Sequence, residues 1–356
     1  MVILRYSFGP TTLVKLSDPK ELKQVLNDPW LESETVIIKP NLVASAPGSY
    51  TSPETLRILL ESLDSRVVVT EGHCIARSMK LTRPDEWDKA PVDEEMGISV
   101  KGKKVNWIWL MSDEGWRWQI SHPGWRWFRE GGHWDQLKKE EKTFLDTLGF
   151  ADLFQEFGVE YVNVTDEVWS GRVADPVEVK RVVESRFKPV FKDKLYSMLP
   201  KKLYDLRGST FISLSKLQSY PSFSIKNLFG LIPDPLRPSW HGVKHLRLAD
   251  SIIGINKVYR SFFNIYGICE TLYAPMVRHQ EGKFSDPDGT KYNVGEGWGV
   301  VAFGRDPVSL DAIFCNLAGF DLTRFDSYID KAKELGSYDE EILKESKMKA
   351  GSWLSG

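Results

Sequence analysis

The sequence has few cysteines and no long apolar run. Its 356 residues include three cysteines, Cys74, Cys269 and Cys315, which lie far apart. Their spacing excludes a CxxC zinc ribbon and a ferredoxin-type run of cluster ligands, and it gives no disulfide framework. No apolar run reaches the roughly 20 residues that a transmembrane helix needs, and the first residues lack the apolar region of a signal peptide. Because few cysteines fit a reducing compartment, we expect a cytoplasmic protein.

The common catalytic and nucleotide-binding motifs are also absent. The sequence contains no P-loop, GxGxxG, GxSxG or HExxH motif, which argues against the usual nucleotide-binding, dehydrogenase, serine-hydrolase and zincin mechanisms. The formal net charge is −2, so no overall field favours nucleic acid. The content of hydrophobic residues is 42% and of charged residues 27%, which is typical of a globular chain.

Strand and helix patterns alternate along the chain. Residues 36–38 and 66–70 are β-branched and strand-like, and residues 53–63 between them begin with a Ser-Pro-Glu helix start. A strand, a helix and a strand in about 35 residues form a βαβ unit, which implies parallel pairing. Further strands are predicted at residues 161–164, 210–214, 262–266 and 299–304, and further helices at residues 144–157 and 306–319. We therefore expect an α/β fold with a mostly parallel sheet and helices on both faces, plus a Trp-rich insertion.

The alternation sets the expected domain organisation. Residues 1–330 are predicted to form one α/β core domain, interrupted by an insertion at residues 75–142. Residues 331–356 are predicted to form a charged helical tail. The stretch 187–207 is basic and amphipathic, which is compatible with a solvated surface helix or an interfacial one.

Polar residues follow each predicted strand. In open α/β sheets, ligands bind outside the carboxyl ends of the strands, and parallel strands bring those ends to one edge. Strand ends are also polar simply because they meet loops and water. The residues in question are Lys39, Asn41, Glu71, His73, Thr165, Asp166, Ser215, Lys216, Glu270, Arg305 and Asp306.

Several of these residues have both a structural and a functional interpretation. Lys39 and Asn41 could hold a phosphate or a carboxylate, or be a solvated lysine and a turn asparagine. Lys226 lies in an apolar run, where an ammonium needs a carboxylate or anion partner. Asp306 is most simply a helix N-cap. Asp311 lies in the apolar stretch 310–317 and faces either solvent or a site, with Mg²⁺ as one ligand it could bind.

The sequence resembles the bacterial and archaeal domain-of-unknown-function family 362, over most of residues 30–320. The first and last matching segments, residues 36–43 and 304–312, are the more specific ones. The other matching positions are Thr51, Pro53, Glu71, Gly72, Lys226, Asn227, Phe229, Gly230 and His245.

The resemblance points to candidate site residues but implies no particular reaction. Some members of the family carry an iron–sulfur segment, but this chain has no such run of cysteines, so we expect no cluster here. The family usually shows Lys-x-His after the central strand, where this chain has Lys216-Leu217-Gln218. On these grounds Glu71, Lys226 and Asp311 are the candidate catalytic residues. The candidate ligand-binding residues are Lys39, Asn41, Thr51, Asn227 and His245, and the candidate ligands of a divalent metal are Asp306 and Asp311.

Tryptophan is concentrated in the insertion. Seven of the 13 tryptophans lie between Trp107 and Trp134, interleaved with arginines, and the Trp-x-Trp spacing predicts a β-hairpin. The segment could form a small satellite core with cation–π contacts, or a lid over the strand ends. It could also contact a membrane surface or a protein partner through residues 105–134. Stacking on single-stranded nucleic acid is disfavoured by the neutral charge.

The sequence leaves open whether the chain is an enzyme. The first hypothesis is an enzyme that binds an anionic small molecule at the carboxyl ends of the strands, with or without a divalent metal. The second is a non-catalytic binding or scaffold protein that uses the Trp-rich insertion. The third is a redox protein related to the iron–sulfur members of the family. Substrate and oligomeric state are beyond the reach of the sequence.

Overall fold

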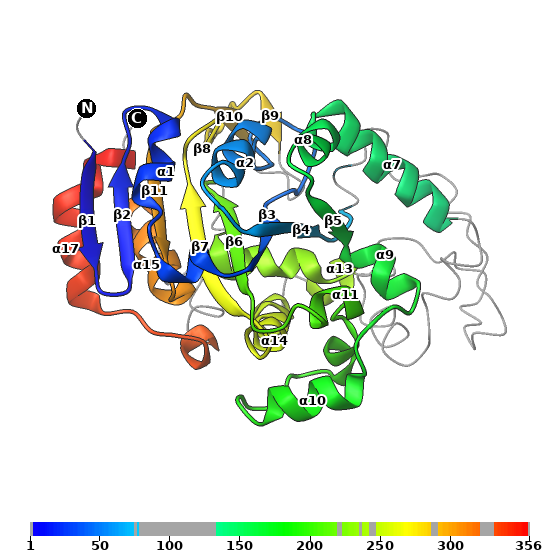
Figure 1. The fold of residues 1–356 in the computed structure, drawn as a ribbon. Helices are drawn as coiled ribbons and strands as arrows, with labels where there is room; N and C mark the ends of the chain where they lie inside the picture. Colours follow the sequence, from blue (N-terminus) through cyan, green and yellow to red (C-terminus); the bar gives the residue numbers. More distant parts are fainter. Residues whose placement is uncertain are drawn as a thin grey trace.

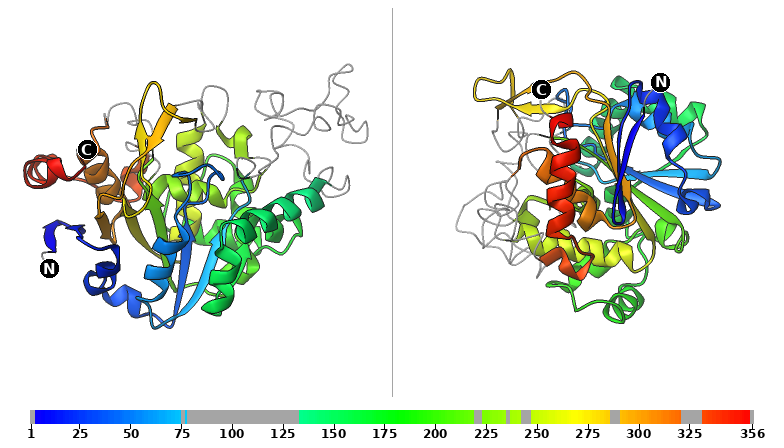
Figure 2. Two further views of the ribbon diagram at one scale, coloured as in Figure 1. Left: turned by 90° about the horizontal axis from the view of Figure 1, so that it is seen from above. Right: turned by 90° about the vertical axis from the view of Figure 1, so that its left-hand side faces the viewer.

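The computed structural model describes residues 3–74, 77, 133–218, 223–234, 237–241, 247–285, 291–320 and 331–354. The dominant element is an eight-stranded sheet with the order β1-β2-β11-β7-β6-β3-β4-β5, and helices cover both of its faces (Figures 1 and 2). The predicted α/β class is therefore confirmed. The predicted Trp-rich hairpin lies outside the described residues.

Five neighbouring strands of this sheet run parallel. They are β7 (Asn264–Glu270), β6 (Thr210–Lys216), β3 (Thr35–Pro40), β4 (Arg66–Glu71) and β5 (Glu160–Asn163). The first four are largely buried on both faces, as expected for parallel strands covered by helices, whereas three of the four residues of the edge strand β5 are half-buried. All five carboxyl ends therefore lie at one edge of the sheet, which we call the rim.

The other three strands are antiparallel and extend the sheet beyond β7. Strand β11 (Val300–Gly304) pairs antiparallel with both β7 and β2 (Thr11–Lys15), and β1 (Leu4–Phe8) pairs antiparallel with β2. The expectation that β11 ends at the rim is wrong. Because β11 runs against β7, it brings Arg305 and Asp306 to the opposite edge.

One face of the sheet is covered by α1 (Leu22–Val25), α2 (Pro53–Leu60), α7 (His133–Thr147) and α8 (Phe150–Glu156), near the top of Figure 1. Side chains of alternate strand residues, such as Ile38 and Val69, pack with these helices into one buried cluster. Helix α7 begins inside the range assigned to the insertion.

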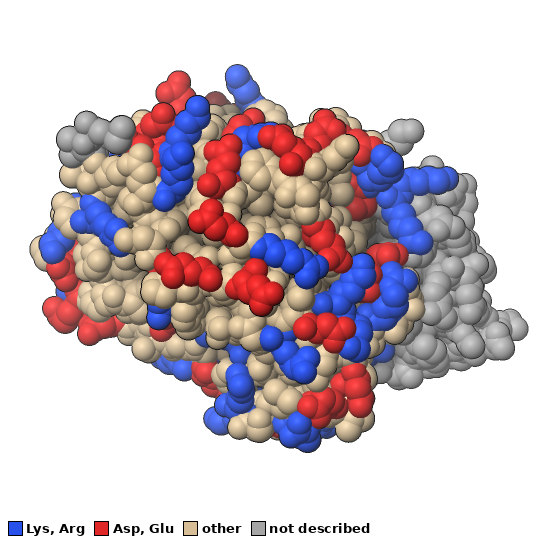
Figure 3. Space-filling model, viewed as in Figure 1, with Lys and Arg blue, Asp and Glu red and all other residues tan. Residues whose placement is uncertain are grey.

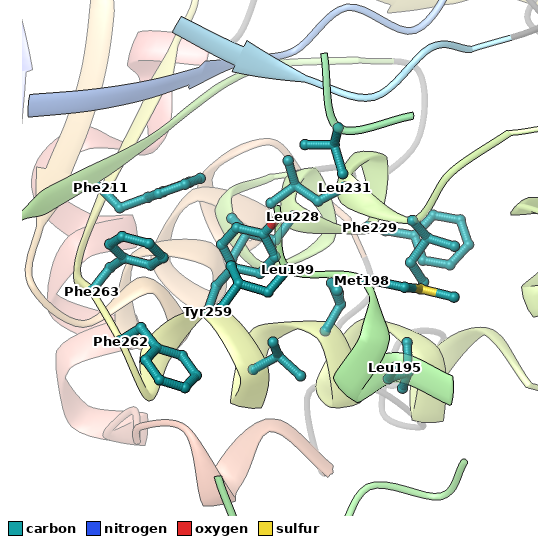
Figure 4. Packing of buried hydrophobic residues seen from close by; sticks show 14 of the residues in the cluster. Leu195, Met198, Leu199, Phe211, Leu228, Phe229, Leu231, Tyr259, Phe262 and Phe263 are labelled. Carbon is teal, nitrogen blue, oxygen red and sulfur yellow. The ribbon is translucent and has the colours of Figure 1, made fainter. Parts of the chain in front are cut away.

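The opposite face carries α9 (Val164–Trp169), α10 (Pro176–Glu184), α12 (Ser224–Asn227), α14 (Leu248–Arg260) and α15 (Pro307–Leu317). Figure 4 shows aromatic and aliphatic side chains from β6, α14 and the segments before β6 packed beneath the sheet. The basic, amphipathic stretch 187–207 forms two short helices, η5 (Asp193–Ser197) and α11 (Lys201–Tyr204), rather than one long helix, and its apolar side chains Leu195, Met198 and Leu203 are buried in this cluster.

The C-terminal segment packs on the antiparallel end of the sheet (Figure 2). Leu343 and Ala350 of α17 (Glu340–Ala350) are buried with residues of α15, and Trp353 stacks on Tyr6 of β1. The remaining elements are short: β8 (Met276–Arg278), β9 (Phe284–Ser285), β10 (Lys291–Val294), α11 (Lys201–Tyr204), α13 (Arg237–His241), η1 (Pro19–Glu21), η2 (Pro29–Glu32), η5 (Asp193–Ser197), η6 (Leu228–Leu231), η9 (Ala332–Glu334) and η10 (Gly351–Leu354). In the described part of the chain, no helix is long and apolar enough to cross a membrane.

Candidate functional site

A buried ion pair lies at the rim, between the ends of β3 and β4. The Lys39 ammonium donates to Glu71 Oε2 at 2.5 Å, to Asn227 Oδ1 at 2.9 Å and to the Pro40 carbonyl at 2.9 Å. The side chains of Lys39 and Glu71 are each 2% exposed. Three predicted site residues that are far apart in the sequence therefore meet in one cluster.

Burial makes Lys39 chemically unusual. It lowers the pKa of the Lys39 ammonium to about 8, although the adjacent Glu71 carboxylate counteracts part of the effect. All three ammonium protons are used within the cluster, so Lys39 as positioned here has none left for a ligand. A buried ion pair contributes little net stability, and perturbed pKa values concentrate at functional sites.

Asn227 is held against Lys39 by helix α12 and by Asp311. The Asn227 amide donates to the Lys39 carbonyl at 3.0 Å and to Ser213 Oγ at 3.1 Å. The Asp311 carboxylate accepts from the backbone N–H groups of Ser224 and Ile225, at 2.8 and 2.9 Å. Burial raises the pKa of Asp311 to about 8 even though these two N–H groups oppose the shift. Asp311 thus anchors α12, which carries Asn227.

Two glycines allow the chain to close over the ion pair. A Cβ at Gly72 would lie 2.3 Å from the Gly230 carbonyl oxygen, and a Cβ at Gly230 would lie 2.6 Å from Glu71 Oε1 and 2.8 Å from Lys39 Nζ. All three distances are below the van der Waals limit, so a side chain at either position displaces its neighbours. The backbone of η6 therefore approaches the ion pair directly because position 230 has no side chain.

A second cluster adjoins the first and is centred on Glu141 of α7. One carboxylate oxygen contacts His73 Nδ1 at 2.9 Å; the other accepts from Arg77 Nη1 at 2.9 Å and from the Tyr161 hydroxyl at 2.6 Å. Arg77 also lies 3.9 Å from Glu71 Oε1, so it links the two clusters. All of these charged groups are buried.

The electrostatics of this second cluster favour its charged form. Burial disfavours the ionised Glu141, but Arg77 and then His73 outweigh it and lower the pKa of Glu141 to about 2. Burial also disfavours the charged guanidinium, but Glu141 and Glu71 raise the pKa of Arg77. Glu141 is therefore an ionised carboxylate with hydrogen bonds from three side chains.

Asn41 and Thr51 close the loop after β3. Their backbones are joined by the Thr51 N–H, which donates to the Asn41 carbonyl at 2.6 Å, and Thr51 Oγ1 accepts from the Asn41 N–H at 2.9 Å. Ser52 then caps α2. The Asn41 side chain is free of these bonds: within the described residues its buried Nδ2 has no acceptor.

A third buried pair lies at the ends of β6 and β7. Lys216 and Glu270 face each other in register, and the Lys216 ammonium donates to the carbonyls of Tyr50, Tyr273 and Ala274. Burial lowers the pKa of Lys216 and raises that of Glu270. Glu270 Oε1 and Gln218 Oε1 are buried with no donor among the described residues. Gln218 is the position at which the family usually has histidine.

The remaining candidates lie elsewhere. Asp306 is the N-cap of α15 at the edge opposite the rim, where it accepts from Val308 N–H, Ser309 N–H and Ser337 N–H. Lys226 is half-buried on α12 beside Asn227. His245 lies outside the described residues. In the part of the chain that the structure covers, no group of three or more His, Cys, Asp or Glu residues could hold a metal ion.

Sequence reasoning missed Arg77, Glu141, Tyr161 and Arg237. Arg237 ties the rim together by donating to the carbonyls of His73, Gly230 and Ile232 at 2.7 to 2.9 Å. Glu141 sits on a strongly charged helix where nothing marks it as inward-facing, and Arg77 lies in the predicted insertion. The only signal in the sequence near these four residues is the pair of polar residues Thr165 and Asp166, which follows the predicted strand at residues 161–164.

The buried charges of the two connected clusters are balanced. Three cations, Lys39, Arg77 and Arg237, face three carboxylates, Glu71, Glu141 and Asp234. On the surface viewed in Figure 3, Lys and Arg are likewise interspersed with Asp and Glu. The distinctive feature of the rim is therefore not excess charge but buried hydrogen-bonding atoms that lack partners within the described residues, namely Asn41 Nδ2, His73 Nε2, Arg77 Nε, Gln218 Oε1 and Glu270 Oε1.

Comparison with known proteins gives one match. A family model described as a domain of unknown function (DUF362) matches residues 125–316, which is more than half of the chain. The matched range contains Glu141, Asn227 and Asp311 but begins after Lys39 and Glu71. No curated protein and no solved structure matches the chain.

Proposed function

The chain belongs to the DUF362 family, and we propose that it is an enzyme that binds an anionic small molecule, a phosphate or a carboxylate, at the rim of its sheet. The observation that carries this proposal is a pair of buried donors, Asn41 Nδ2 and Arg77 Nε, that have no acceptor among the described residues. Unpaired buried donors cost roughly 1–3 kcal/mol each, and an anion can accept from both.

The position of the two donors supports a shared ligand region. Asn41 follows β3 and Arg77 follows the neighbouring β4, at the edge where α/β sheets bind ligands. Phe144 of α7 contacts the surroundings of both donors. The Arg77 guanidinium carbon lies 5.3 Å from the centre of its ring, and the ring of Tyr50, in the loop that begins at Asn41, packs edge-on with the ring centres 6.2 Å apart.

The Lys39–Glu71 pair fits an enzyme better than a purely structural role. Burial lowers the pKa of Lys39 to about 8, so Lys39 gives up a proton closer to neutral pH than an exposed lysine does. Asn227 and Gly230 fix the pair from the opposite side of the rim. In this proposal the pair holds or supplies a proton, and Asn41 and Arg77 orient the anion.

A thermal-shift screen tests the proposal. The wild-type chain is heated with inorganic phosphate, pyruvate and a panel of phosphorylated and carboxylate metabolites, with and without Mg²⁺, Mn²⁺ or Zn²⁺. We expect at least one anion to raise the melting temperature by several degrees, because binding to the folded state stabilises it by mass action. The samples that contain metal test the prediction that Asp306 and Asp311 bind a divalent metal ion.

Two variants locate the effect. Asn41→Ala removes the unpaired donor and is expected to abolish the shift, while Asn264→Ala, at the opposite end of β7, is expected to retain it. If no anion stabilises the wild type, or if Asn41→Ala responds like the wild type, the proposed anion site is wrong.

A further inference from the structure

We infer that His73 and Glu141 form a proton-transfer dyad at the rim, with His73 as the base and Glu141 as the residue that positions it. His73 Nδ1 lies 2.9 Å from Glu141 Oε2, and both side chains are buried, at 1% and 6% exposure. His73 Nε2 is buried and has no hydrogen-bond partner among the described residues. This inference rests on the proposed function, since the base acts on the bound anion.

The partner of Nδ1 determines the tautomer. The ionised Glu141 carboxylate can only accept hydrogen bonds. The proton shared between the two groups is therefore carried by His73 Nδ1. In the neutral ring the lone pair then lies on Nε2, the nitrogen without a partner. A carboxylate that fixes one ring nitrogen and leaves the other free is the arrangement in which histidine acts as a general base.

The imidazole is held rigidly. The His73 backbone N–H donates to Thr165 Oγ1 at 2.8 Å, and its carbonyl accepts from Arg237 Nη2 at 2.8 Å. Glu141 is fixed in turn by Arg77 and by the Tyr161 hydroxyl. Because both ends of the dyad are fixed, little reorganisation is needed for proton transfer.

The proposed step is a proton transfer. The Nε2 lone pair takes a proton from an O–H or C–H bond of the bound anion, and the electron pair of that bond stays on the ligand. The imidazolium that forms is stabilised by the Glu141 carboxylate, and the negative charge on the ligand faces the Arg77 guanidinium, whose Nε–H has no acceptor in the described part of the chain. Return of the proton restores the neutral imidazole.

Nitrogen NMR of the imidazole rings tests the dyad without a known substrate. The chain has six histidines, and His73→Gln identifies the His73 signals by their loss. In the neutral form we expect a protonated Nδ1 and an unprotonated Nε2. Glu141→Gln should yield a mixture of tautomers, whereas Tyr161→Phe, which removes a different bond to Glu141, should preserve the wild-type tautomer.

Addition of inorganic phosphate, whose monohydrogen form carries an O–H, then tests the link to the anion site. We expect the Nε2 resonance to shift in the wild type and in Tyr161→Phe, and to shift much less in Asn41→Ala. A protonated Nε2 with a bare Nδ1 overturns the dyad. The predicted tautomer without a phosphate-induced shift overturns its link to the anion site, whereas the anion site itself is tested separately by the thermal-shift screen and its Asn41→Ala variant.

Discussion

Lys39 shows how a single buried charge defines the rim. Its ammonium is enclosed by Glu71, Asn227 and a backbone carbonyl, and with each side chain only 2% exposed water compensates neither charge appreciably. The desolvation of both ions largely cancels their attraction, so the pair adds little stability as a unit. Removal of one partner is a different matter, because it leaves the other charge buried and unpaired.

We therefore expect Lys39→Met to lower the free energy of unfolding by about 3–5 kcal/mol, and Lys39→Met with Glu71→Gln to cost less than the sum of the two single changes. Urea unfolding measures both. Arg57→Ala, which breaks the exposed pair with Glu156, is the control and should change stability little. Additive effects at Lys39 and Glu71 would contradict the description of the pair as a coupled unit.

Glu141 gives the rim a pH dependence. Its pKa is about 2 in the folded state against an ordinary 4.5, so its contribution is complete above pH 4.5 and is lost as the pH falls toward 2. Glu141→Gln should cost roughly 3 kcal/mol at pH 7 and less as the pH falls through that window. Unfolding free energies of the wild type and the variant between pH 2 and 7 measure this, and a constant difference would refute it.

Individual site residues were predictable from the sequence where they interrupt or directly follow an apolar run. Lys39, Asn41, Glu71 and Asn227 all lie at the rim, and each stands out as a polar residue in or after an apolar run. Glu141 could not be found in this way. It belongs to a helix with many charged residues, and only the packing of α7 on the sheet decides which of them points inward.

At the scale of elements, the short helix α12 positions Asn227. A helix of four residues is too short to be stable alone, so its backbone N–H groups depend on an acceptor from elsewhere. Asp311 supplies that acceptor from α15. Asp311, which stands out in the sequence as a carboxylate within an apolar run, thus supports the rim indirectly by anchoring α12.

Replacement of Asp311 should show this dependence. Asp311→Ala leaves two buried N–H groups without an acceptor and should lower the free energy of unfolding by about 1–3 kcal/mol for each of them. Asp311→Asn keeps one acceptor oxygen and should lie between the alanine variant and the wild type in urea unfolding. An Asn variant as unstable as the Ala variant would mean that the carboxylate acts through its charge rather than as a backbone acceptor.

Gly72 marks a close approach between the end of β4 and η6. A Cβ there meets the Gly230 carbonyl at 2.3 Å, a backbone atom that cannot rotate away. Gly72→Ala should therefore destabilise the protein by about 1–3 kcal/mol and weaken the anion-induced thermal shift. Gly351→Ala is the matched control, since its nearest neighbour is the flexible Lys347 side chain. Equal melting temperatures for the two variants would contradict the close packing of η6 on β4.

For the whole molecule, the sequence predicts the parallel half of the sheet better than the rest. Continuous β-branched runs with helix starts between them identify β3, α2, β4 and β6, because local patterns decide those elements. The direction of β11 is a tertiary property. It depends on pairing with β2, almost 300 residues earlier, and no local pattern records it.

The antiparallel pairing of β11 places the predicted site residues at two opposite edges of the sheet. The parallel strands bring Lys39, Glu71 and their partners to the rim, while β11 carries Asp306 to the other edge, where it caps α15. The charge of the two connected clusters is balanced internally, and the donors and acceptors that stay unpartnered among the described residues near them include atoms of Asn41, His73 and Arg77. Recognition of an anion by buried donors is therefore the central claim of this account.

A crystal structure of the chain with the anion that raises its melting temperature most tests that claim directly. We predict electron density for the anion at the rim, with oxygen atoms within hydrogen-bond distance of Asn41 Nδ2 and Arg77 Nε. An anion bound elsewhere, or a rim in which these two atoms still have no partner, would contradict it.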